Sequence, residues 1–216
     1  MTVYLIPGQG GDARLFTHLE ITGGHDVRHI TYELPAPGLS MQEYAAILAG
    51  QIDTSEPFVI IGVSLGGMIA TEMSQLVNAE KTIIISSAKS WNELPPRYRF
   101  QKRVPIYKMV SPRLSIFGAK LLQPIVEPDR QSQKEIFKAM LQDKDPRFIA
   151  RTIPMIMQWD RTEAPDNIYH IHGSNDHTLP ISHVAYDHLV EGGSHMMVLT
   201  DAARVSAAVN GVLANL

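Results

Sequence analysis

The sequence predicts an α/β protein in which helices cover both faces of a mainly parallel sheet of about six strands. Short runs of β-branched apolar residues alternate along the chain with segments of helical pattern, which is the order of repeated βαβ units. The runs 59–61 and 83–85 are apolar at every position rather than at alternate ones. Strands that are buried on both faces have this pattern. With 216 residues, 44% of them hydrophobic, the chain can bury one sizeable core.

Six strands and four core helices follow from these patterns. Ser40 and Glu43 have the spacing of a capping box, so a helix should begin there. In the last helix we expect Thr200 as the N-cap and Asp201 in the first turn, where its charge interacts favourably with the helix dipole. The predicted strands are 2–6, 27–32, 58–63, 82–86, 168–172 and 188–191, and the predicted helices are 12–21, 40–52, 65–77 and 200–213.

The β pattern is interrupted between residues 90 and 160 by a stretch rich in Pro, Arg, Lys and Met. Helical segments are predicted at 112–122, 130–141 and 147–157, so we interpret 90–160 as a helical lid inserted into a core of residues 1–89 and 161–216. Residues 91–160 carry 13 Lys or Arg against 7 Asp or Glu, although the whole chain has a net charge of −3. Such a lid could steer acidic substrates, but electrostatic docking on an acidic core is the favoured interpretation.

The composition excludes several classes of function and partner. A net charge of −3 gives no general attraction to nucleic acid or to an anionic membrane, so neither partner is expected. The absence of cysteine excludes disulfides, thiolate catalysis and cysteine-bound zinc, and we expect no cofactor and no metal. Residues 1–7 lack a signal-peptide pattern and no apolar run approaches ~20 residues, so we expect a soluble, cytoplasmic protein. Nothing in the sequence indicates an oligomeric state.

The segment 58–68 predicts a strand, a sharp turn and a helix, with Ser64 at the turn. Gly62 and Gly66 lie two residues to either side of the serine, which is the pattern of a nucleophile elbow. The turn brings these flanking positions against neighbouring backbone, where a side chain would collide. Because a lone serine hydroxyl is a poor nucleophile near neutral pH, the sequence should also supply a general base and a group that orients it.

His195 is the best candidate for the base, because it lies in a glycine-rich loop between the last strand and the final helix. For His170 and His172, which lie within a predicted strand, a structural role is favoured. Asp176 follows the same strand at its carboxyl end, where catalytic groups gather in parallel sheets. It would accept a hydrogen bond from the second ring nitrogen of His195 and stabilise the imidazolium. The chain order Ser64, Asp176, His195 is the one that the motif predicts.

Two backbone amides are expected to stabilise the negative charge that develops on a carbonyl oxygen during acyl transfer. Leu65, directly after the serine, would supply one amide, and Gln9, in the glycine-rich loop 7–11, would supply the other. An apolar acyl pocket is a further hypothesis, against which plain core packing is the simpler explanation. Its candidate residues are Met68, Trp91, Met155, Trp159 and Met196.

The elbow, the early glycine loop, the acid loop 173–180 and the segment 193–195 together resemble the α/β-hydrolase superfamily. The likeness is greatest to small lid-bearing carboxylesterases, including the pimeloyl-ester hydrolase of biotin synthesis, whose lid is also an insertion. It covers the core on both sides of the lid and implies a reduced α/β-hydrolase fold. The sequence departs from the family in two respects. The usual His-Gly of the oxyanion loop is Pro7-Gly8, and the first strand corresponds to the family's third, so two antiparallel edge strands are expected to be missing.

A dinucleotide-binding oxidoreductase is the main alternative. Gly8, Gly10 and Ala13 satisfy the pattern G-x-G-x-x-A after a strand, and Glu33 ends the next strand about where a ribose-binding acid would lie. This interpretation leaves the elbow and its candidate base and acid without roles, so the hydrolase interpretation is favoured. A third possibility is a non-hydrolytic relative of the same fold, such as a lyase, an acyltransferase, a perhydrolase or a ligand receptor.

The sequence therefore predicts a serine hydrolase that cleaves a carboxylic ester or thioester of a small molecule. An acyl intermediate would form on Ser64 with His195 as the base, and water activated by His195 would then release the acid. Asp176 would complete the catalytic triad.

Overall fold

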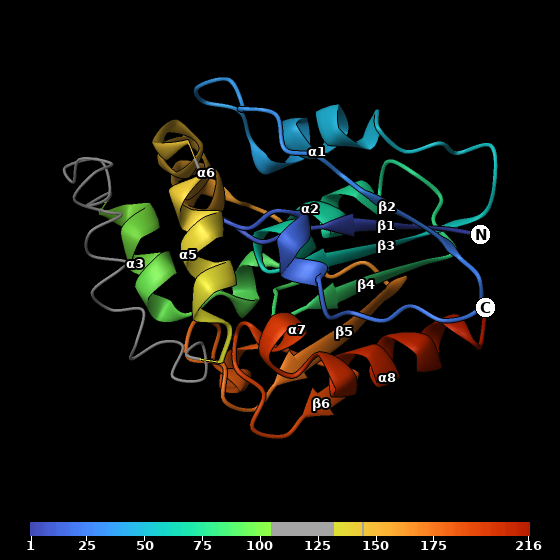
Figure 1. The fold of residues 1–216 in the computed structure, drawn as a ribbon. Helices are drawn as coiled ribbons and strands as arrows, with labels where there is room; N and C mark the ends of the chain where they lie inside the picture. The colour runs from blue at the N-terminus through green and yellow to red at the C-terminus, as the bar shows by residue number, and fades with distance from the viewer. Residues whose placement is uncertain (105–131, 144) are drawn as a thin grey trace.

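The protein, in a computed structural model, contains one six-stranded sheet in which every strand pair is parallel (Figure 1). The structure describes residues 1–104, 132–143 and 145–216. The strand order is β2-β1-β3-β4-β5-β6, which confirms the predicted α/β class, the parallel sheet and the number of strands. The strands are β1 (Thr2–Ile6), β2 (Asp26–His29), β3 (Phe58–Val63), β4 (Lys81–Ile85), β5 (Ile168–Gly173) and β6 (His188–Val190).

Helices cover both faces of this sheet. α1 (Met41–Ala49) and α2 (Leu65–Met73) pack on one face. The other face is covered by the short 3-10 helix η1 (Ala13–Phe16), α7 (Met197–Thr200) and α8 (Ala202–Leu213). The central strands are therefore enclosed on both sides, as the continuous apolar runs predict.

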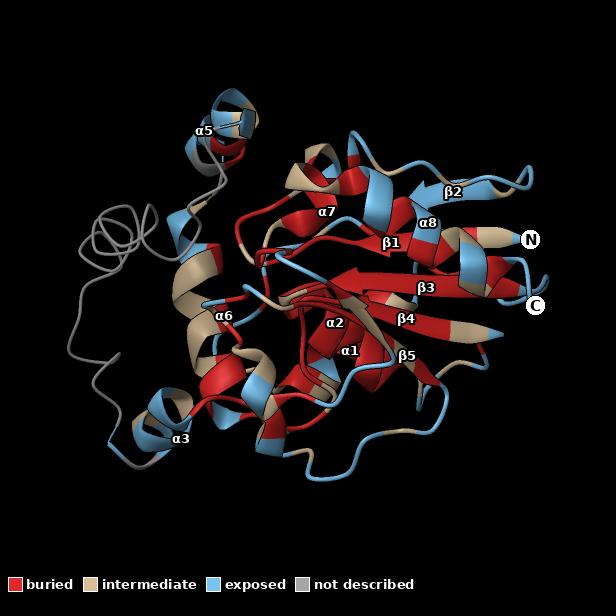
Figure 2. Ribbon diagram, turned by 90° about the horizontal axis from the view of Figure 1, so that it is seen from below, coloured by how far each residue is buried: buried red, intermediate tan, exposed pale blue. Residues whose placement is uncertain are grey.

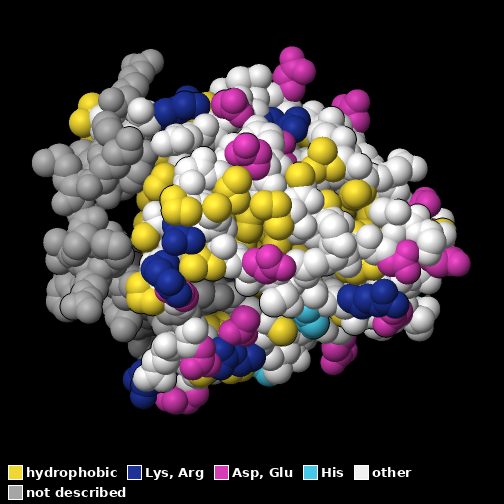
Figure 3. Space-filling model, turned by 90° about the horizontal axis from the view of Figure 1, so that it is seen from above, with side chains coloured by type: hydrophobic (Ala, Val, Ile, Leu, Met, Phe, Trp, Pro, Cys, Tyr) yellow, Lys and Arg dark blue, Asp and Glu magenta, His cyan; other side chains and the backbone are white. Residues whose placement is uncertain are grey.

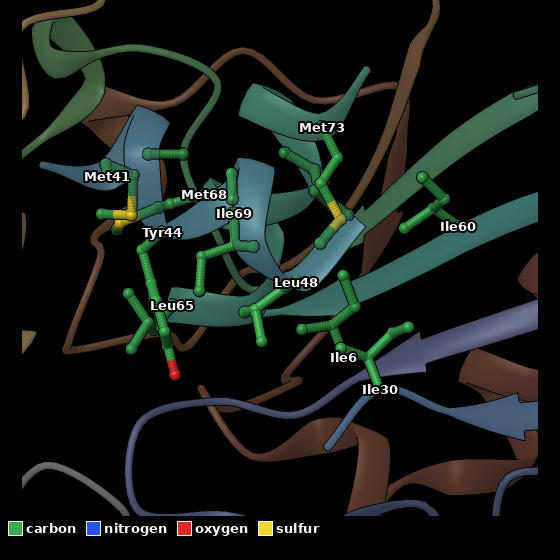
Figure 4. Packing of buried hydrophobic residues seen from close by; sticks show 14 of the residues in the cluster. Ile6, Ile30, Met41, Tyr44, Leu48, Ile60, Leu65, Met68, Ile69 and Met73 are labelled. Atoms are coloured by element: carbon green, nitrogen blue, oxygen red, sulfur yellow. The ribbon is translucent and has the colours of Figure 1, made fainter. Parts of the chain in front are cut away.

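Alternate residues of the central strands β1, β3 and β4 enter two separate hydrophobic clusters. Ile60 of β3 lies in the cluster that contains α1 and α2, whereas its neighbours Val59 and Ile61 lie in the cluster that contains α8. Figure 4 shows strand side chains of the first cluster directed toward those of α1 and α2. Burial of each such aliphatic side chain contributes about 1.5–3 kcal/mol, so every central strand stabilises two layers at once.

Three further helices lie beyond the carboxyl ends of the strands: α3 (Pro96–Arg103), α5 (Lys134–Gln142) and α6 (Pro146–Gln158). Both chain termini lie at the opposite end of the molecule, and in Figure 2 β1 and β3 between the two ends are mostly buried, whereas β2 is exposed. These three helices, which belong to the region that the sequence assigns to an inserted lid, therefore lie over one end of the sheet.

The helices predicted in this region can be compared only in part. The prediction 147–157 is confirmed by α6, and 130–141 corresponds to α5 from Lys134 onward; residues 130 and 131 lie outside the described residues. The prediction 112–122 also lies outside the described residues. The sequence did not predict α3. The division of the chain into a core and a lid at residues 90 and 160 stays a prediction.

The predicted capping box at the start of α1 is present. Ser40 Oγ accepts a hydrogen bond from the Glu43 amide at 3.2 Å, and Glu43 Oε2 accepts one from the Ser40 amide at 2.8 Å. Two unpaired amides of the first turn are thereby satisfied by side chains only three residues apart. Other element ends shift by a few residues: α2 ends at Met73 rather than at residue 77, and β2 ends at His29 rather than at residue 32.

The helix predicted at 12–21 is wrong except for the single turn of η1. The Asp12 carboxylate accepts the Arg14 amide at 3.0 Å, a local bond that competes with continued helix. The chain then runs along α8, where the amides of Glu20 and Thr22 donate to the side chains of Ser206 and Asn210, each at 2.9 Å. Hydrogen bonds to α8, which is distant in the sequence, thus replace the hydrogen bonds that a longer helix would have formed within itself.

The assignment of Thr200 as N-cap of the last helix is also wrong, because the last helix begins two residues later and Thr200 belongs to the helix before it. Thr200 is the last residue of α7, and its amide donates to the Met196 carbonyl at 3.1 Å. The chain turns at Asp201, whose φ is −136°, and α8 begins at Ala202. Asp201 occupies the N-cap position, but its carboxylate accepts from the Arg204 side chain at 3.1 Å instead of from a backbone amide.

Charged side chains of both signs are present on the surface. On the face shown in Figure 3, hydrophobic side chains gather in the middle and acidic and basic side chains surround them. Among the described residues, no helix combines the length and the apolar character that a bilayer crossing requires.

β5 carries a pair of histidines inside the core. His170 and His172 are both fully buried, and His172 Nδ1 lies 3.1 Å from His170 Nε2. Burial and, to a lesser degree, the neighbouring His172 ring together lower the pKa of His170 to about 3. Burial also lowers the pKa of His172, although the Asp176 carboxylate opposes this shift. Both rings are therefore neutral near pH 7, which fits the structural role that the sequence favours.

Replacement of Gly173 by alanine should destabilise the protein severely. A Cβ atom on Gly173 would lie 2.1 Å from the Gly193 carbonyl oxygen, so the two loops that follow β5 and β6 would have to separate. We expect Gly173→Ala to lower the free energy of unfolding by about 3 kcal/mol or more, measured by urea denaturation. The matched control is Gly211→Ala in α8, where a Cβ meets nothing within 4 Å. It should stabilise the protein by about 0.5–1 kcal/mol; equal effects of the two substitutions would contradict the prediction.

The buried His170 should make the protein sensitive to acid. The unfolded chain takes up a proton on this residue near pH 6.5, whereas the folded protein resists protonation down to about pH 3. The unfolded state binds more protons in this window, so the stability of the fold should fall as pH falls from about 6.5. The free energy of unfolding of His170→Leu, measured between pH 7 and pH 4, should depend less steeply on pH than that of the wild type. Parallel slopes for the two proteins would show that His170 does not contribute.

Candidate active site

Ser64 lies between the end of β3 and the start of α2, in a backbone conformation that is rare for a side-chain-bearing residue, with φ 54° and ψ −118°. The turn requires close backbone approach at both flanking glycines. A Cβ on Gly62 would lie 2.3 Å from the Gly66 carbonyl oxygen, and a Cβ on Gly66 would lie 2.3 Å from the Ile6 carbonyl oxygen. The glycines at these two positions are therefore required, for the reason that the sequence predicts.

Contacts from β4 support this turn. The Ser64 amide donates to the Ile85 carbonyl at 3.0 Å, and Ser87 Oγ donates to the Ser64 carbonyl at 2.7 Å. A Cβ on Gly67 would lie 2.4 Å from Ser87 Oγ, so the start of α2 lies directly against this hydroxyl. Nothing in the local sequence pattern around Ser87 indicates this role.

The structure brings Ser64, His195 and Asp176 together in one hydrogen-bonded chain. His195 Nε2 lies 2.9 Å from Ser64 Oγ, and His195 Nδ1 lies 2.8 Å from Asp176 Oδ2. Asp176 belongs to the loop after β5, and His195 belongs to the loop between β6 and α7. Three side chains that are far apart in sequence therefore meet at the carboxyl ends of neighbouring strands.

Asp176 is 3% exposed, and amides satisfy its second oxygen. Asp176 Oδ1 accepts hydrogen bonds from the amides of Thr178 at 2.8 Å and Leu179 at 2.7 Å. Burial by itself raises the pKa of this carboxyl, but the adjacent His195 ring and the hydrogen bonds from His195 and Leu179 outweigh burial and hold the pKa below its usual value. An ionised carboxylate can only accept, so the proton of the neutral His195 ring resides on Nδ1. Nε2 is then free to accept the proton of Ser64.

The histidine pair of β5 contacts the same acid loop. His172 Nε2 lies 2.9 Å from the Leu179 carbonyl oxygen and 3.7 Å from Asp176 Oδ2. The acid loop also contacts the next loop, because the Asn175 amide donates to the Gly193 carbonyl at 2.9 Å. These contacts fix the carboxylate relative to the loop that carries His195.

The two residues whose amides are predicted to bind an oxyanion belong to segments that lie next to the serine. Leu65 directly follows Ser64, and the loop that contains Gln9 runs past the serine: a Cβ on Gly8 would lie 3.3 Å from Ser64 Cβ. This loop forms a turn in which the Gly11 amide donates to the Gly8 carbonyl at 3.0 Å. Within the described parts of the chain, no acceptor contacts the amides of Gln9 and Leu65. Their role as oxyanion donors stays a prediction.

The candidate pocket residues do not form one group in the structure. Met68, Met155 and Trp159 are buried in the cluster that contains α1 and α2, and the half-buried Trp91 packs against it. Met196 packs against the cluster on the other face of the sheet. Their role in an acyl pocket stays a prediction.

Trp159 also has a polar contact that the sequence did not indicate. Trp159 Nε1 donates to Glu72 of α2 at 2.6 Å, and Arg161 donates to both oxygens of the same carboxylate, each at 2.7 Å. The Glu72 carboxylate is 2% exposed and is compensated by these three donors. The contacts join the carboxyl end of α6 to the helix that follows Ser64.

The geometry around the first loop does not favour dinucleotide binding. The glycine loop leads into η1, a 3-10 helix of four residues, so the described structure lacks the α-helix N-terminus that would bind a pyrophosphate. Glu33 is exposed. No three His, Asp or Glu side chains among the described residues are arranged to hold a metal ion.

A surface groove of about 670 Å³ lies elsewhere, between α8 and β6. Its lining includes Lys81 at the amino end of β4 and Leu216 at the C-terminus. Ser64, at the carboxyl end of β3, does not line it.

Solved structures of several enzymes have the same fold as this chain. A thermophilic esterase from Thermogutta terrifontis superposes with a TM-score of 0.70 at 16% identity, over 100% of this chain and 90% of the esterase. An enol-lactonase from Burkholderia xenovorans LB400 superposes with a TM-score of 0.72 at 15% identity, over 98% and 90% of the two chains. YbtT, a type II thioesterase of the yersiniabactin biosynthetic pathway, superposes with a TM-score of 0.60 at 16% identity, over 98% and 91%.

Sequence comparison identifies the family of this chain but does not identify a particular curated relative. None of the curated proteins matches the sequence. The sequence model of the alpha/beta hydrolase family matches residues 3–208, which include the elbow, the acid loop and the loop of His195. The chain therefore belongs to the alpha/beta hydrolase family.

Proposed function

We propose that the protein is a serine hydrolase that cleaves a carboxylic ester or thioester of a small molecule through an acyl-serine intermediate. One observation carries this proposal: the hydrogen-bonded chain from Ser64 through His195 to Asp176, with separations of 2.9 and 2.8 Å. A serine joined in this way to a neutral imidazole and a buried carboxylate is arranged to lose its proton as it attacks.

In the first half of the reaction, Ser64 Oγ attacks the carbonyl carbon of the substrate while His195 Nε2 accepts the hydroxyl proton. Asp176 stabilises the imidazolium that forms, because its carboxylate accepts the Nδ1 proton at 2.8 Å. The amides of Gln9 and Leu65 donate to the oxyanion of the tetrahedral intermediate, and each such donor is typically worth about 3 kcal/mol. His195 then protonates the departing alcohol or thiol, and the acyl group remains on Ser64.

In the second half, a water molecule takes the position of the leaving group. His195 accepts a proton from this water as its oxygen attacks the acyl carbon, and the same two amides stabilise the second tetrahedral intermediate. His195 returns the proton to Ser64 Oγ as the carboxylic acid departs. These steps need no cofactor, because each one only moves a proton between His195 Nε2 and the serine, the leaving group or the water.

The proposed substrate class is supported by the enzymes that share this fold. They include an esterase, an enol-lactonase and a thioesterase, whose names all describe cleavage of an acyl–oxygen or acyl–sulfur bond. The helices α3, α5 and α6 lie beyond the end of the sheet at which Ser64 lies, and this supports the proposal that residues 90–160 form a lid over the site. A lid that limits access of water strengthens the hydrogen bonds inside the site.

Loss of the nucleophile should abolish both hydrolysis and covalent labelling. We expect wild-type protein to hydrolyse at least one member of a panel of p-nitrophenyl esters and acyl thioesters of increasing chain length, and to react with a fluorophosphonate probe. Ser64→Ala should lower kcat by about 10⁴-fold or more and should not be labelled, and His195→Ala should lower kcat to a similar extent. The midpoint of thermal unfolding should change little in Ser64→Ala, since the serine side chain contributes little apolar packing.

The matched control is Ser55→Ala, which removes a serine on an exposed loop and should leave hydrolysis and labelling at the wild-type level. Near-parental activity of Ser64→Ala, or a probe attached to another residue, would refute the proposed function. Binding of a nicotinamide dinucleotide without labelling would support the oxidoreductase alternative instead.

A further inference from the structure

A buried threonine of α6 forms a hydrogen bond with the loop that carries one of the proposed oxyanion donors. Gln9 Nε2 donates to Thr152 Oγ1 at 2.7 Å, and Thr152 is fully buried. We propose that Thr152 is a positioning residue, which holds the oxyanion loop in its working geometry through the side chain of Gln9. This inference rests on the proposed function, because it concerns the efficiency of the same reaction.

The direction of this hydrogen bond is fixed by the rest of the network. The single hydroxyl proton of Thr152 is donated within α6 to the Phe148 carbonyl, 2.9 Å away. The oxygen is therefore left to accept, and the amide group of Gln9 is its donor. A buried hydroxyl whose partner is lost costs free energy, so the bond selects one position of the Gln9 side chain relative to α6.

The glycine-rich loop around Gln9 depends on external contacts such as the hydrogen bond to Thr152. Gln9 is flanked by Gly8, Gly10 and Gly11, and Gly10 has a φ of 82°. Glycines allow many backbone conformations, so the peptide planes of this loop are set by external contacts more than by local preference. The plane that contains the Gln9 amide must be correctly oriented for its N–H group to point at an oxyanion.

A second contact joins the same helix to the other end of the loop. The Tyr32 hydroxyl donates to the Pro7 carbonyl at 2.6 Å, and the ring of Phe148 packs on the ring of Tyr32 with their centroids 5.0 Å apart. Burial raises the pKa of Tyr32, which keeps this hydroxyl protonated and able to donate. α6 thus contacts the loop directly at Gln9 and through Tyr32 at Pro7. The helix acts as a support for the oxyanion loop as well as a cover for the site.

The loop also contacts the nucleophile, so a small displacement reaches the reacting atoms. A Cβ on Gly8 would lie 3.3 Å from Ser64 Cβ and 3.9 Å from Ser64 Oγ. If the Gln9 tether is lost, the loop can shift without unfolding any helix or strand. The consequence should appear in the chemical step rather than in substrate binding, because the oxyanion exists only in the tetrahedral intermediates and the transition states that flank them.

Thr152→Val tests this proposal, because valine has nearly the same shape and lacks the oxygen that accepts from Gln9. We expect kcat for the best p-nitrophenyl ester to fall by about five- to tenfold, the usual worth of one hydrogen bond, while KM stays within about twofold of the wild-type value. Thr152→Ser keeps the hydroxyl and should restore most of kcat. Gln9→Leu should lower kcat by a similar factor, and the double variant with Thr152→Val should be no worse than either single variant.

A control variant separates this effect from general damage to the core. Thr82→Val in β4 also removes a fully buried threonine hydroxyl, and Thr82 Oγ1 has no partner among the described residues. It should leave kcat and KM unchanged. Thermal unfolding is followed for every variant, and kinetics are measured well below the lowest midpoint.

The outcomes distinguish this inference from the proposed function. If wild-type protein hydrolyses esters but Thr152→Val keeps the wild-type kcat, or if Thr152→Ser is no better than Thr152→Val, the positioning role is wrong and the serine hydrolase proposal stands. Multiplicative losses in the double variant would likewise show that the two residues act separately. If Ser64→Ala retains hydrolysis, both proposals fail.

Discussion

The candidate site depends on one close approach of backbone, where β3 turns into α2 at Ser64. The turn is possible because Gly62 and Gly66 have no side chains: a Cβ at either position would lie 2.3 Å from a backbone oxygen. Ser64 itself adopts a φ of 54°, a conformation that costs of order 1–3 kcal/mol. The fully buried β3 on one side, and the hydrogen bond from Ser87 to the Ser64 carbonyl on the other, hold the serine in this conformation. Its hydroxyl is thereby presented at the end of the sheet.

The order of the strands brings the other two groups to the serine. β5 and β6 are parallel neighbours, so the loops that carry Asp176 and His195 leave the sheet at the same end as Ser64. The absence of a side chain at Gly173 lets these two loops touch, and the amides of Thr178 and Leu179 stabilise the buried carboxylate. The charge of the carboxylate is thus compensated by the His195 ring and by backbone amides of its own loop.

The features predicted correctly from the sequence are those whose causes are local. The capping box of Ser40 and Glu43 forms because its partners are three residues apart, and the buried strands form because their own residues are apolar throughout. The helix predicted at 12–21 is wrong because the hydrogen bonds of this segment are distant: the amides of Glu20 and Thr22 donate to α8 instead of continuing a helix. The N-cap of the final helix is wrong because Thr200 belongs to the short preceding helix α7, and no local signal marks the turn at Asp201 that separates the two helices.

The sequence by itself determined the α/β class, the parallel sheet, the elbow around Ser64 and the candidates for base and acid, because each leaves a pattern within about ten residues. Only the tertiary structure decided that Ser64, His195 and Asp176 meet, and that Tyr32, Ser87 and Thr152 support the loops around them. Thr152 lies 143 residues from its partner Gln9, and a bond over that distance exists only once the whole core has packed. Local geometry follows from residues that are neighbours in the sequence. Contacts between distant residues instead depend on how the complete layers of helices and sheet pack against one another.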